Sequence, residues 1–404
     1  MNKLKSSLFV FVICTVWPFV VMAEQAYLLT EKTYKALEAA QQQMADEQYS
    51  QAEVALIKLV SETTDGSYER AVVLQTLGYL YTETGDYARA TERFRAALAL
   101  NALPEEVNHN LRYNLAQLLI ADGQFQQGIN LLEQWLQKED GPENRVYVLL
   151  ATAHYQLKQF TKTVENIRIA ISRDNAPKEE WFRLQLAAHL EMQQYDSAIN
   201  VLETLLIMKP KDKTYWQQLS SLYARQEKQL TALAVTALVK RLDLGDADTV
   251  MQLSNMYRYL RIPFKSGELL QQSLDNKVIS GNFENLEKLA DSWLSAREGD
   301  RAAVVLEKMR GADNSGETDL KLARVYVSEE RWQSAQEPIV AAIDKLSSEK
   351  QGDAYLLAGM IAYHLEDIET AEQRLQQALR FDKQRSQAAQ WLRHLQQRQP
   401  EEDV

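Results

Sequence analysis

The sequence predicts an all-α protein, an α-solenoid of stacked helix–turn–helix repeats that ends in a C-terminal capping helix. The first observation behind this prediction is composition. Glycine accounts for 14 and proline for 8 of the 404 residues, below the usual shares of about 7% and 5%. The second observation is a pattern of small and large residues that returns every 33 to 38 residues along the chain. Scarce glycine also leads us to expect few sharp turns.

The repeat pattern is clearest between residues 77 and 97. Small residues at Gly78, Ala90 and Ala97 alternate there with the large side chains of Tyr81 and Phe94. Small side chains allow two helices to approach closely, and large ones fill the space beside them. A single unit of this kind cannot bury its own apolar face, so neighbouring units must stack. We expect ten units, with starts near residues 33, 71, 109, 144, 180, 213, 247, 283, 316 and 352.

The pattern resembles that of the tetratricopeptide repeat (TPR) family, whose helix–turn–helix unit has about 34 residues. The resemblance implies a right-handed superhelix of TPR-type repeats over residues 33–385. Residues 386–398 are then expected to form the capping helix, because Ala388, Trp391 and Leu395 give this stretch an apolar side and its other side is rich in Gln and Arg. Residues 24–32 are expected to be an N-terminal extension and residues 399–404 an acidic tail.

Residues 1–23 have the features of a cleaved secretory signal peptide. Lys3 and Lys5 supply positive charge, residues 8–21 are an apolar run, and Ala23 is the small residue before the expected cleavage site. The single cysteine, Cys14, lies inside this segment. The mature chain, residues 24–404, would therefore have no disulfide, thiol nucleophile or cysteine metal site. An exported chain without disulfides suits the bacterial periplasm. Retention of the segment as a membrane anchor is the alternative.

The charge balance excludes some classes of partner. The whole chain has a formal net charge of −11, and removing Lys3 and Lys5 lowers it to −13. A broad acidic surface disfavours nucleic acid and anionic membrane surfaces, and it would attract a basic protein partner.

Motifs of catalysis and cofactor binding are missing from the sequence. The chain has no phosphate-binding glycine loop, no dinucleotide fingerprint and no nucleophile elbow. Five histidines fall singly in helical stretches without metal-ligand spacing: His109, His154, His189, His364 and His394. We therefore expect a protein that is not an enzyme and that holds no cofactor and no metal.

The candidate binding surface follows from the repeat register. In each unit, positions 2, 5, 9 and 12 of the first helix lie away from the packing stripe and face the concave side of a TPR stack. Trp216, Trp293 and Trp332 occupy packing positions, so we expect them in the core. Partner-binding residues expected on the concave face are Tyr79, Tyr113, Gln117, Thr152, Tyr155, Trp181, Gln217, Asn255, Arg258, Arg324 and Tyr363.

Several stretches outside the generic pattern resemble one particular family. They are residues 131–160, 215–220, 262–267, 289–294 and 388–392, which are similar to the periplasmic TPR proteins encoded beside a second TonB–ExbB–ExbD system in marine gammaproteobacteria. The resemblance implies a periplasmic scaffold that is accessory to TonB-dependent uptake of iron complexes, with TonB, ExbB or ExbD as partners. Alternatives are an adaptor in cell-envelope assembly (peptidoglycan, polysaccharide or outer-membrane protein biogenesis), a small-ligand or glycan-binding solenoid, and an enzyme with a site assembled from distant repeats.

Overall fold

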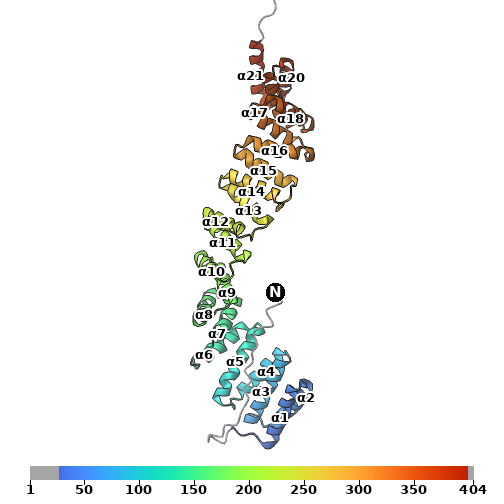
Figure 1. Cartoon of the computed structure of the whole chain (residues 1–404). Coiled ribbons are helices and arrows are strands. Elements are labelled where there is room, and N and C mark those ends of the chain that lie inside the picture. Colours follow the sequence, from blue (N-terminus) through green and yellow to red (C-terminus); the bar gives the residue numbers. More distant parts are fainter. Residues whose placement is uncertain (1–26, 399–404) are drawn as a thin grey trace, which may run out of the picture. The chain divides into compact units, whose positions relative to one another are not determined.

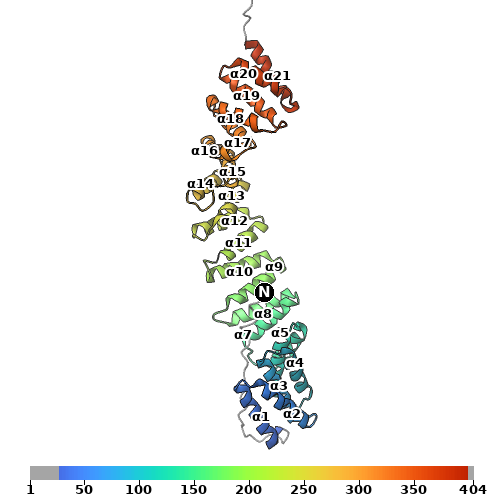
Figure 2. The same ribbon diagram turned by 90° about the vertical axis from the view of Figure 1, so that its right-hand side faces the viewer.

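The computed structural model describes residues 27–398, and all regular secondary structure in this range is helical. The expected signal peptide and the acidic tail lie outside the described residues. Two compact units divide the chain after Ala198, within α10 (Tyr195–Met208), and each unit is described by itself. Within each unit, successive helices follow one another in the order of the sequence (Figures 1 and 2).

The first unit consists of antiparallel helix pairs. We call the first helix of each pair the A helix and the second the B helix. The helices are α1 (Glu31–Ala45), α2 (Tyr49–Glu62), α3 (Tyr68–Glu83), α4 (Tyr87–Ala99), α5 (Glu105–Ala121), α6 (Phe125–Leu136), α7 (Asn144–Gln156), α8 (Phe160–Arg173) and α9 (Glu179–Glu191).

The second unit continues the same arrangement and adds a short 3-10 turn, η2 (Arg310–Ala312). Its further helices are α11 (Lys213–Arg225), α12 (Gln229–Arg241), α13 (Ala247–Tyr259), α14 (Pro263–Asp275), α15 (Phe283–Ser295), α16 (Gly299–Met309), α17 (Glu317–Ser328), α18 (Trp332–Lys345), α19 (Gln351–His364), α20 (Ile368–Ala378) and α21 (Asp382–Arg398).

The A helices begin close to the starts expected from the repeat pattern. The largest difference is at α5, which begins at Glu105 after Pro104 rather than near residue 109. Capping side chains set several of the earlier starts, because an N-terminal hydroxyl or carboxylate can accept a hydrogen bond from a free backbone N–H. Thr30 accepts from Thr33 N at 3.3 Å, and Ser67 accepts from Arg70 N at 3.1 Å. The all-α repeat fold expected from the sequence is confirmed.

Small residues lie where helices cross closely. A Cβ at Gly78 would overlap the ring of Phe94, and a Cβ at Gly267 would lie 2.7 Å from the indole of Trp293. Trp293 is 2% exposed, in agreement with its expected core position. Trp216 and Trp332 are half-buried instead.

The expectation of few sharp turns is wrong. Every A–B turn between α1 and α20 contains one residue with positive φ, at which the chain reverses direction. This left-handed position usually holds glycine because a Cβ is strained there. Glycine fills it only at Gly85 and Gly123, and polar or charged residues fill it at Glu47, Lys158, Gln193, Glu227, Arg261, Arg297, Glu330 and Glu366. Scarce glycine therefore does not indicate scarce turns in this chain.

The last helix, α21, packs as the expected cap, although it begins at Asp382 rather than at residue 386. It contacts both α19 and α20. Leu395 is 4% exposed and lies in one cluster with Ala362 and Leu375, while Trp391 packs at the edge of that cluster. α21 therefore covers apolar surface of the last helix pair.

Candidate interaction surface

Within each unit, A helices of neighbouring repeats contact one another directly. Such contacts join α1 to α3, α5 to α7 and α7 to α9 in the first unit, and α17 to α19 in the second. The outward-facing residues of these helices therefore form a surface that runs across several repeats, which we call the A-helix face.

In the first unit, tyrosines on this face are held by aromatic neighbours. Tyr79 is half-buried, and its ring meets Phe94 edge-on at a centroid distance of 5.2 Å. Its hydroxyl accepts a hydrogen bond from Nδ2 of Asn114 at 3.2 Å. Because Asn114 lies on α5, Tyr79 links the A helices of two repeats.

Tyr113 lies on α5, the A helix of the next repeat, with its hydroxyl oxygen buried. Its ring lies 4.8 Å from that of Trp135, and the guanidinium of Arg145 on α7 lies 5.9 Å from its centroid. Burial raises the pKa of the Tyr113 hydroxyl, although the charge of Arg145 opposes this shift. Tyr155 is half-buried with its ring edge-on to Phe160 at 5.5 Å. The rings are thus fixed before any partner binds.

Two other expected residues of this unit are less distinctive. Gln117 is half-buried. Thr152 is also half-buried, and its hydroxyl donates to the carbonyl of Val148 at 2.8 Å, a bond within its own helix.

Trp181 requires a correction, because it is buried rather than on the A-helix face. It is 9% exposed and packs in a cluster with Ala151, Ile167 and Ala170. α9 begins at Glu179, so Trp181 lies in its first turn, against the preceding helix pair. The side chain is a core residue and not a surface anchor.

In the second unit, the expected residues differ in whether their side chains contact neighbouring helices. Gln217, Asn255 and Arg258 are exposed. Arg324 is exposed too, but it pairs with Asp353 on α19 at 2.6 Å. The Tyr363 hydroxyl is 2.9 Å from Nε2 of His394 on α21. Arg324 and Tyr363 therefore also join neighbouring helices.

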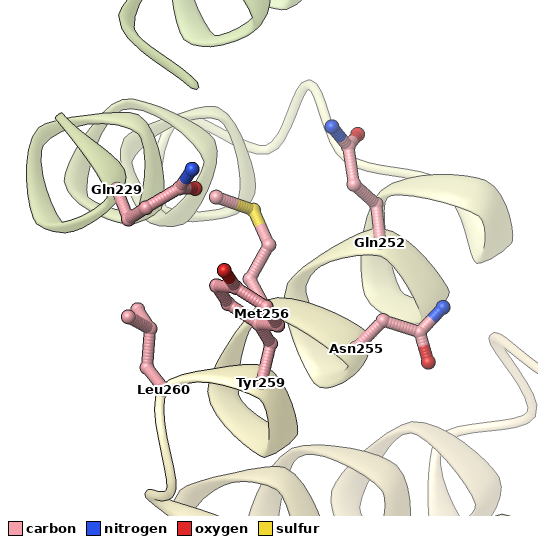
Figure 3. Close-up of a pocket in the computed structure, with 6 residues that line it drawn as sticks. All are labelled: Gln229, Gln252, Asn255, Met256, Tyr259 and Leu260. Carbon is pink, nitrogen blue, oxygen red and sulfur yellow. The ribbon is translucent and has the colours of Figure 1, made fainter. Parts of the chain in front are cut away.

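A pocket of about 350 Å³ lies at the end of α13 and the start of α12 (Figure 3). Of the residues expected from the sequence, Asn255 lines it. The others were missed because none of them lies at position 2, 5, 9 or 12 of an A helix, and three of them, Gln229, Tyr259 and Leu260, lie at helix ends. The lining residues are Gln229, Gln252, Asn255, Met256, Tyr259 and Leu260.

A signal for this pocket exists in the sequence. Tyr259, which lines the pocket, is a large residue outside the packing stripe and is 74% exposed. A large residue at a turn-proximal position that the repeat does not require would have drawn attention to this region.

Comparison with known proteins supports the repeat type. A family model described as tetratricopeptide repeat matches residues 81–153. This part of the chain is similar to tetratricopeptide repeats. None of the curated proteins compared with the chain matches it.

Solved structures, two of them described as TPR proteins, are similar to the chain at low identity. YrrB, described as a TPR protein with an unusual peptide-binding site, is 16% identical, with 48% of this chain and 97% of YrrB covered and a TM-score of 0.38. A TPR protein from Parabacteroides merdae is 14% identical, with 65% and 99% covered and a TM-score of 0.38. The Cut9–Hcn1 hetero-tetramer of the APC/C is 13% identical, with 90% and 84% covered and a TM-score of 0.31. These low values do not indicate a shared function.

The TPR match includes Tyr113, Gln117 and Thr152 of the A-helix face. TPR repeats typically act as non-catalytic scaffolds that bind other proteins. Between residues 27 and 398, no group of three or more His, Cys, Asp or Glu side chains could hold a metal ion. None of the helices in this range has both the length and the apolar character that a membrane span needs.

Proposed function

We propose that this chain is a periplasmic interaction scaffold whose A-helix face binds a segment of a protein partner. The observation that carries the proposal is the row of Tyr79, Tyr113 and Tyr155 on the successive A helices α3, α5 and α7. Each ring is already held by an aromatic neighbour. A fixed ring loses little conformational freedom on binding, so it is a favourable anchor.

We further propose that the partner belongs to a TonB energy-transduction system that takes up iron complexes through the outer membrane. Support for this partner comes from the resemblance of the five stretches described above. The expected mature charge of −13 also suits a basic partner, and the Lys/Pro-rich periplasmic linker typical of TonB proteins is one. Periplasmic location rests on the signal-peptide features of residues 1–23.

Direct binding measurements test this proposal. The purified mature chain is titrated with the periplasmic domains of TonB and ExbD at low and high salt. Binding to one of them is expected, and it should weaken at high salt because the Debye length falls from about 10 Å at 0.1 M to about 3 Å at 1 M. Replacing Tyr79, Tyr113 and Tyr155 together by Ala should weaken binding by more than about 2 kcal/mol, with circular dichroism as the check on folding.

A matched control is the triple replacement of the same tyrosines by Phe, which keeps the rings and removes the hydroxyls. Absence of association with both domains, together with normal TonB-dependent uptake in a deletion strain, would rule the TonB assignment out. Co-purification with an envelope synthase or insertase would instead support a role in cell-envelope assembly.

A further inference from the structure

The pocket of Figure 3 lies between the A–B turns of two successive repeats in the second unit. Gln229 begins α12 just after the turn at Glu227, and Leu260 follows α13 just before the turn at Arg261. The site is thus built from one side of α13 together with residues beside two A–B turns, and none of the three tyrosines of the first unit lines it.

Three arginines adjoin the pocket in the chain. Arg225 ends α11, Arg258 lies in the last turn of α13, and Arg261 occupies the following turn. All three are exposed, and none of them forms an ion pair or a side-chain hydrogen bond with another described residue. An unpaired guanidinium presents five N–H donors in a planar fork that suits carboxylates.

Two cations on α17, elsewhere in the second unit, form ion pairs within the chain. Lys321 lies 3.2 Å from Asp291 and 3.4 Å from Glu287, and Arg324 pairs with Asp353. The chain has 56 acidic residues against 45 basic ones, so carboxylate partners are plentiful. These three arginines lie close in sequence to the lining residues, although none of them lines the pocket. Having no partner, they are available for carboxylates from another molecule.

The residues that line the pocket are polar or apolar and uncharged. Gln229, Gln252 and Asn255 carry carboxamides, which can both donate to and accept from the main chain of an extended peptide. Met256 and Leu260 supply apolar surface, and no acidic residue lines the pocket. Its volume is at the small end of the range of about 300–1,000 Å³ for ligand pockets, which fits a large side chain and its neighbours.

We propose that this pocket binds an acidic segment of a protein partner, an extended peptide in which a large apolar side chain stands next to carboxylates. The apolar side chain lies against Met256 and Leu260, the carboxamides pair with the peptide main chain, and Arg258 and Arg261 bind the carboxylates. The inference rests on the proposed function because it assumes a protein partner, and it adds a second site with the opposite charge preference.

The test uses two fluorescein-labelled peptides of equal shape. One is GEDFEDG-amide with fluorescein on its N-terminal amine, and the other replaces each Glu by Gln and each Asp by Asn. Fluorescence anisotropy with the purified mature chain at 0.1 M salt should show at least tenfold tighter binding of the acidic peptide, and this preference should shrink towards 1 M salt. The double variant Arg258→Gln/Arg261→Gln should weaken binding of the acidic peptide at least tenfold.

The control variant is Arg168→Gln/Arg241→Gln, which removes the same charge from α8 and from the far end of α12 and should leave binding unchanged. The inference is overturned if the acidic peptide does not bind at 1 mM chain, if both peptides bind equally, or if the Arg258→Gln/Arg261→Gln variant binds as well as the unchanged chain. The TonB and ExbD titrations separate the two proposals. Capture of either domain together with a negative peptide result removes only this second site.

Discussion

The hydroxyl of Tyr81 on α3 donates a hydrogen bond to Oε1 of Glu53 on the preceding B helix, α2, at 2.8 Å. Arg89 on α4 completes the arrangement, with its guanidinium 4.4 Å from the ring centroid and paired to Glu53. One tyrosine thus ties together helices of two repeats.

The same arrangement recurs in the second unit. The Tyr326 hydroxyl donates to Glu307 at 3.0 Å, and Arg331 lies 4.6 Å from its ring. Tyr223 donates to Glu203 at 3.4 Å, a weaker version. A shared geometry at the same repeat position indicates a general contact between neighbouring helix pairs.

Removing the Tyr81 hydroxyl should therefore destabilise the first unit. Tyr81→Phe keeps the ring and loses the hydrogen bond to Glu53, at an expected cost of about 1 kcal/mol. Denaturant unfolding followed by circular dichroism measures it. Tyr34→Phe on α1 is the matched control, because that side chain is 57% exposed. Equal unfolding midpoints for both variants would contradict the prediction.

Stability should also fall in alkali. Burial raises the pKa of Tyr81, and the hydrogen bond and charge of Glu53 raise it further, against the opposing effect of Arg89. A group whose pKa is raised on folding stabilises the folded chain while the group is protonated. This contribution is fully present below the pKa of the unfolded state, about 10, and it is lost as pH rises through the pKa of the folded state. The difference in unfolding free energy between the unchanged chain and Tyr81→Phe should therefore shrink above pH 10. A constant difference up to pH 11 would refute this assignment.

Left-handed turn residues provide a second test. Gly85→Ala places a Cβ at φ 77° and should cost about 1 kcal/mol, whereas Lys158→Gly relieves the strain at φ 58° and should stabilise the chain by about 0.5 kcal/mol. Arg168→Gly, at an exposed position in the interior of α8, is the control and should cost about 1 kcal/mol. Thermal melts that show the same sign for both Gly-introducing variants would exclude this explanation.

A buried carboxylate in the second unit predicts a large loss. Asp319 is fully buried, and its two oxygens lie 2.5 Å from Nε of Arg310 and 2.7 Å from Nζ of Lys345. Asp319→Ala leaves Lys345 without a carboxylate partner and leaves Arg310 paired only with Glu307 and Glu337, so we expect a loss of about 3 kcal/mol. The exposed ion pair between Arg324 and Asp353 is the comparison. Asp353→Ala should cost less than about 1 kcal/mol. Similar unfolding free energies for the two variants would show that the buried cluster is not stabilising.

Acid should weaken the loop before α17. Burial favours the protonated form of Asp313, but hydrogen bonds from the backbone N–H groups of Ser315 and Thr318, at 2.7 and 2.8 Å, outweigh it and lower the pKa to about 2. A lowered pKa gives stability that is present above the unfolded value of 3.8 and lost as pH falls towards 2. Asp313→Asn should cost about 2 kcal/mol at pH 7 and little at pH 2. Unfolding curves at both pH values decide, and a loss that does not depend on pH would contradict the assignment.

The repeat fold could be predicted from sequence because close helix crossings restrict residue size. There is no space for a larger side chain where Gly78 meets Phe94 or where Gly267 meets Trp293. The sequence therefore repeats small residues at these positions. The orientation of Trp181 could not be predicted in the same way. A shift of one residue in a helix turns a side chain by about 100°, which is enough to move it from the surface into the core.

The sequence could single out Tyr259 as a large residue outside the packing stripe, but it could not predict the pocket itself. Its residues come from the start of one B helix and from the middle and end of the next A helix, and only the packing of two repeats brings them together. The sequence also does not show which arginines form ion pairs. Arg258 and Arg324 are the same residue type on A helices, but only Arg324 has a carboxylate partner among the described residues.

The capping helix gives the last prediction. Trp391 meets Tyr363 edge-on at 5.2 Å but is half-buried, so Trp391→Ala should cost about 2 kcal/mol, less than the 3–5 kcal/mol of a fully buried tryptophan. Leu395 is 4% exposed, so Leu395→Ala should cost about 2–4 kcal/mol. Because each repeat is stabilised mainly by its neighbours, both variants should speed hydrogen exchange in α19 and α20 and leave α15 unchanged. Arg393→Ala, on the exposed side of α21, is the control. Uniform exchange along the second unit in the Leu395→Ala variant would mean that the cap does not act locally.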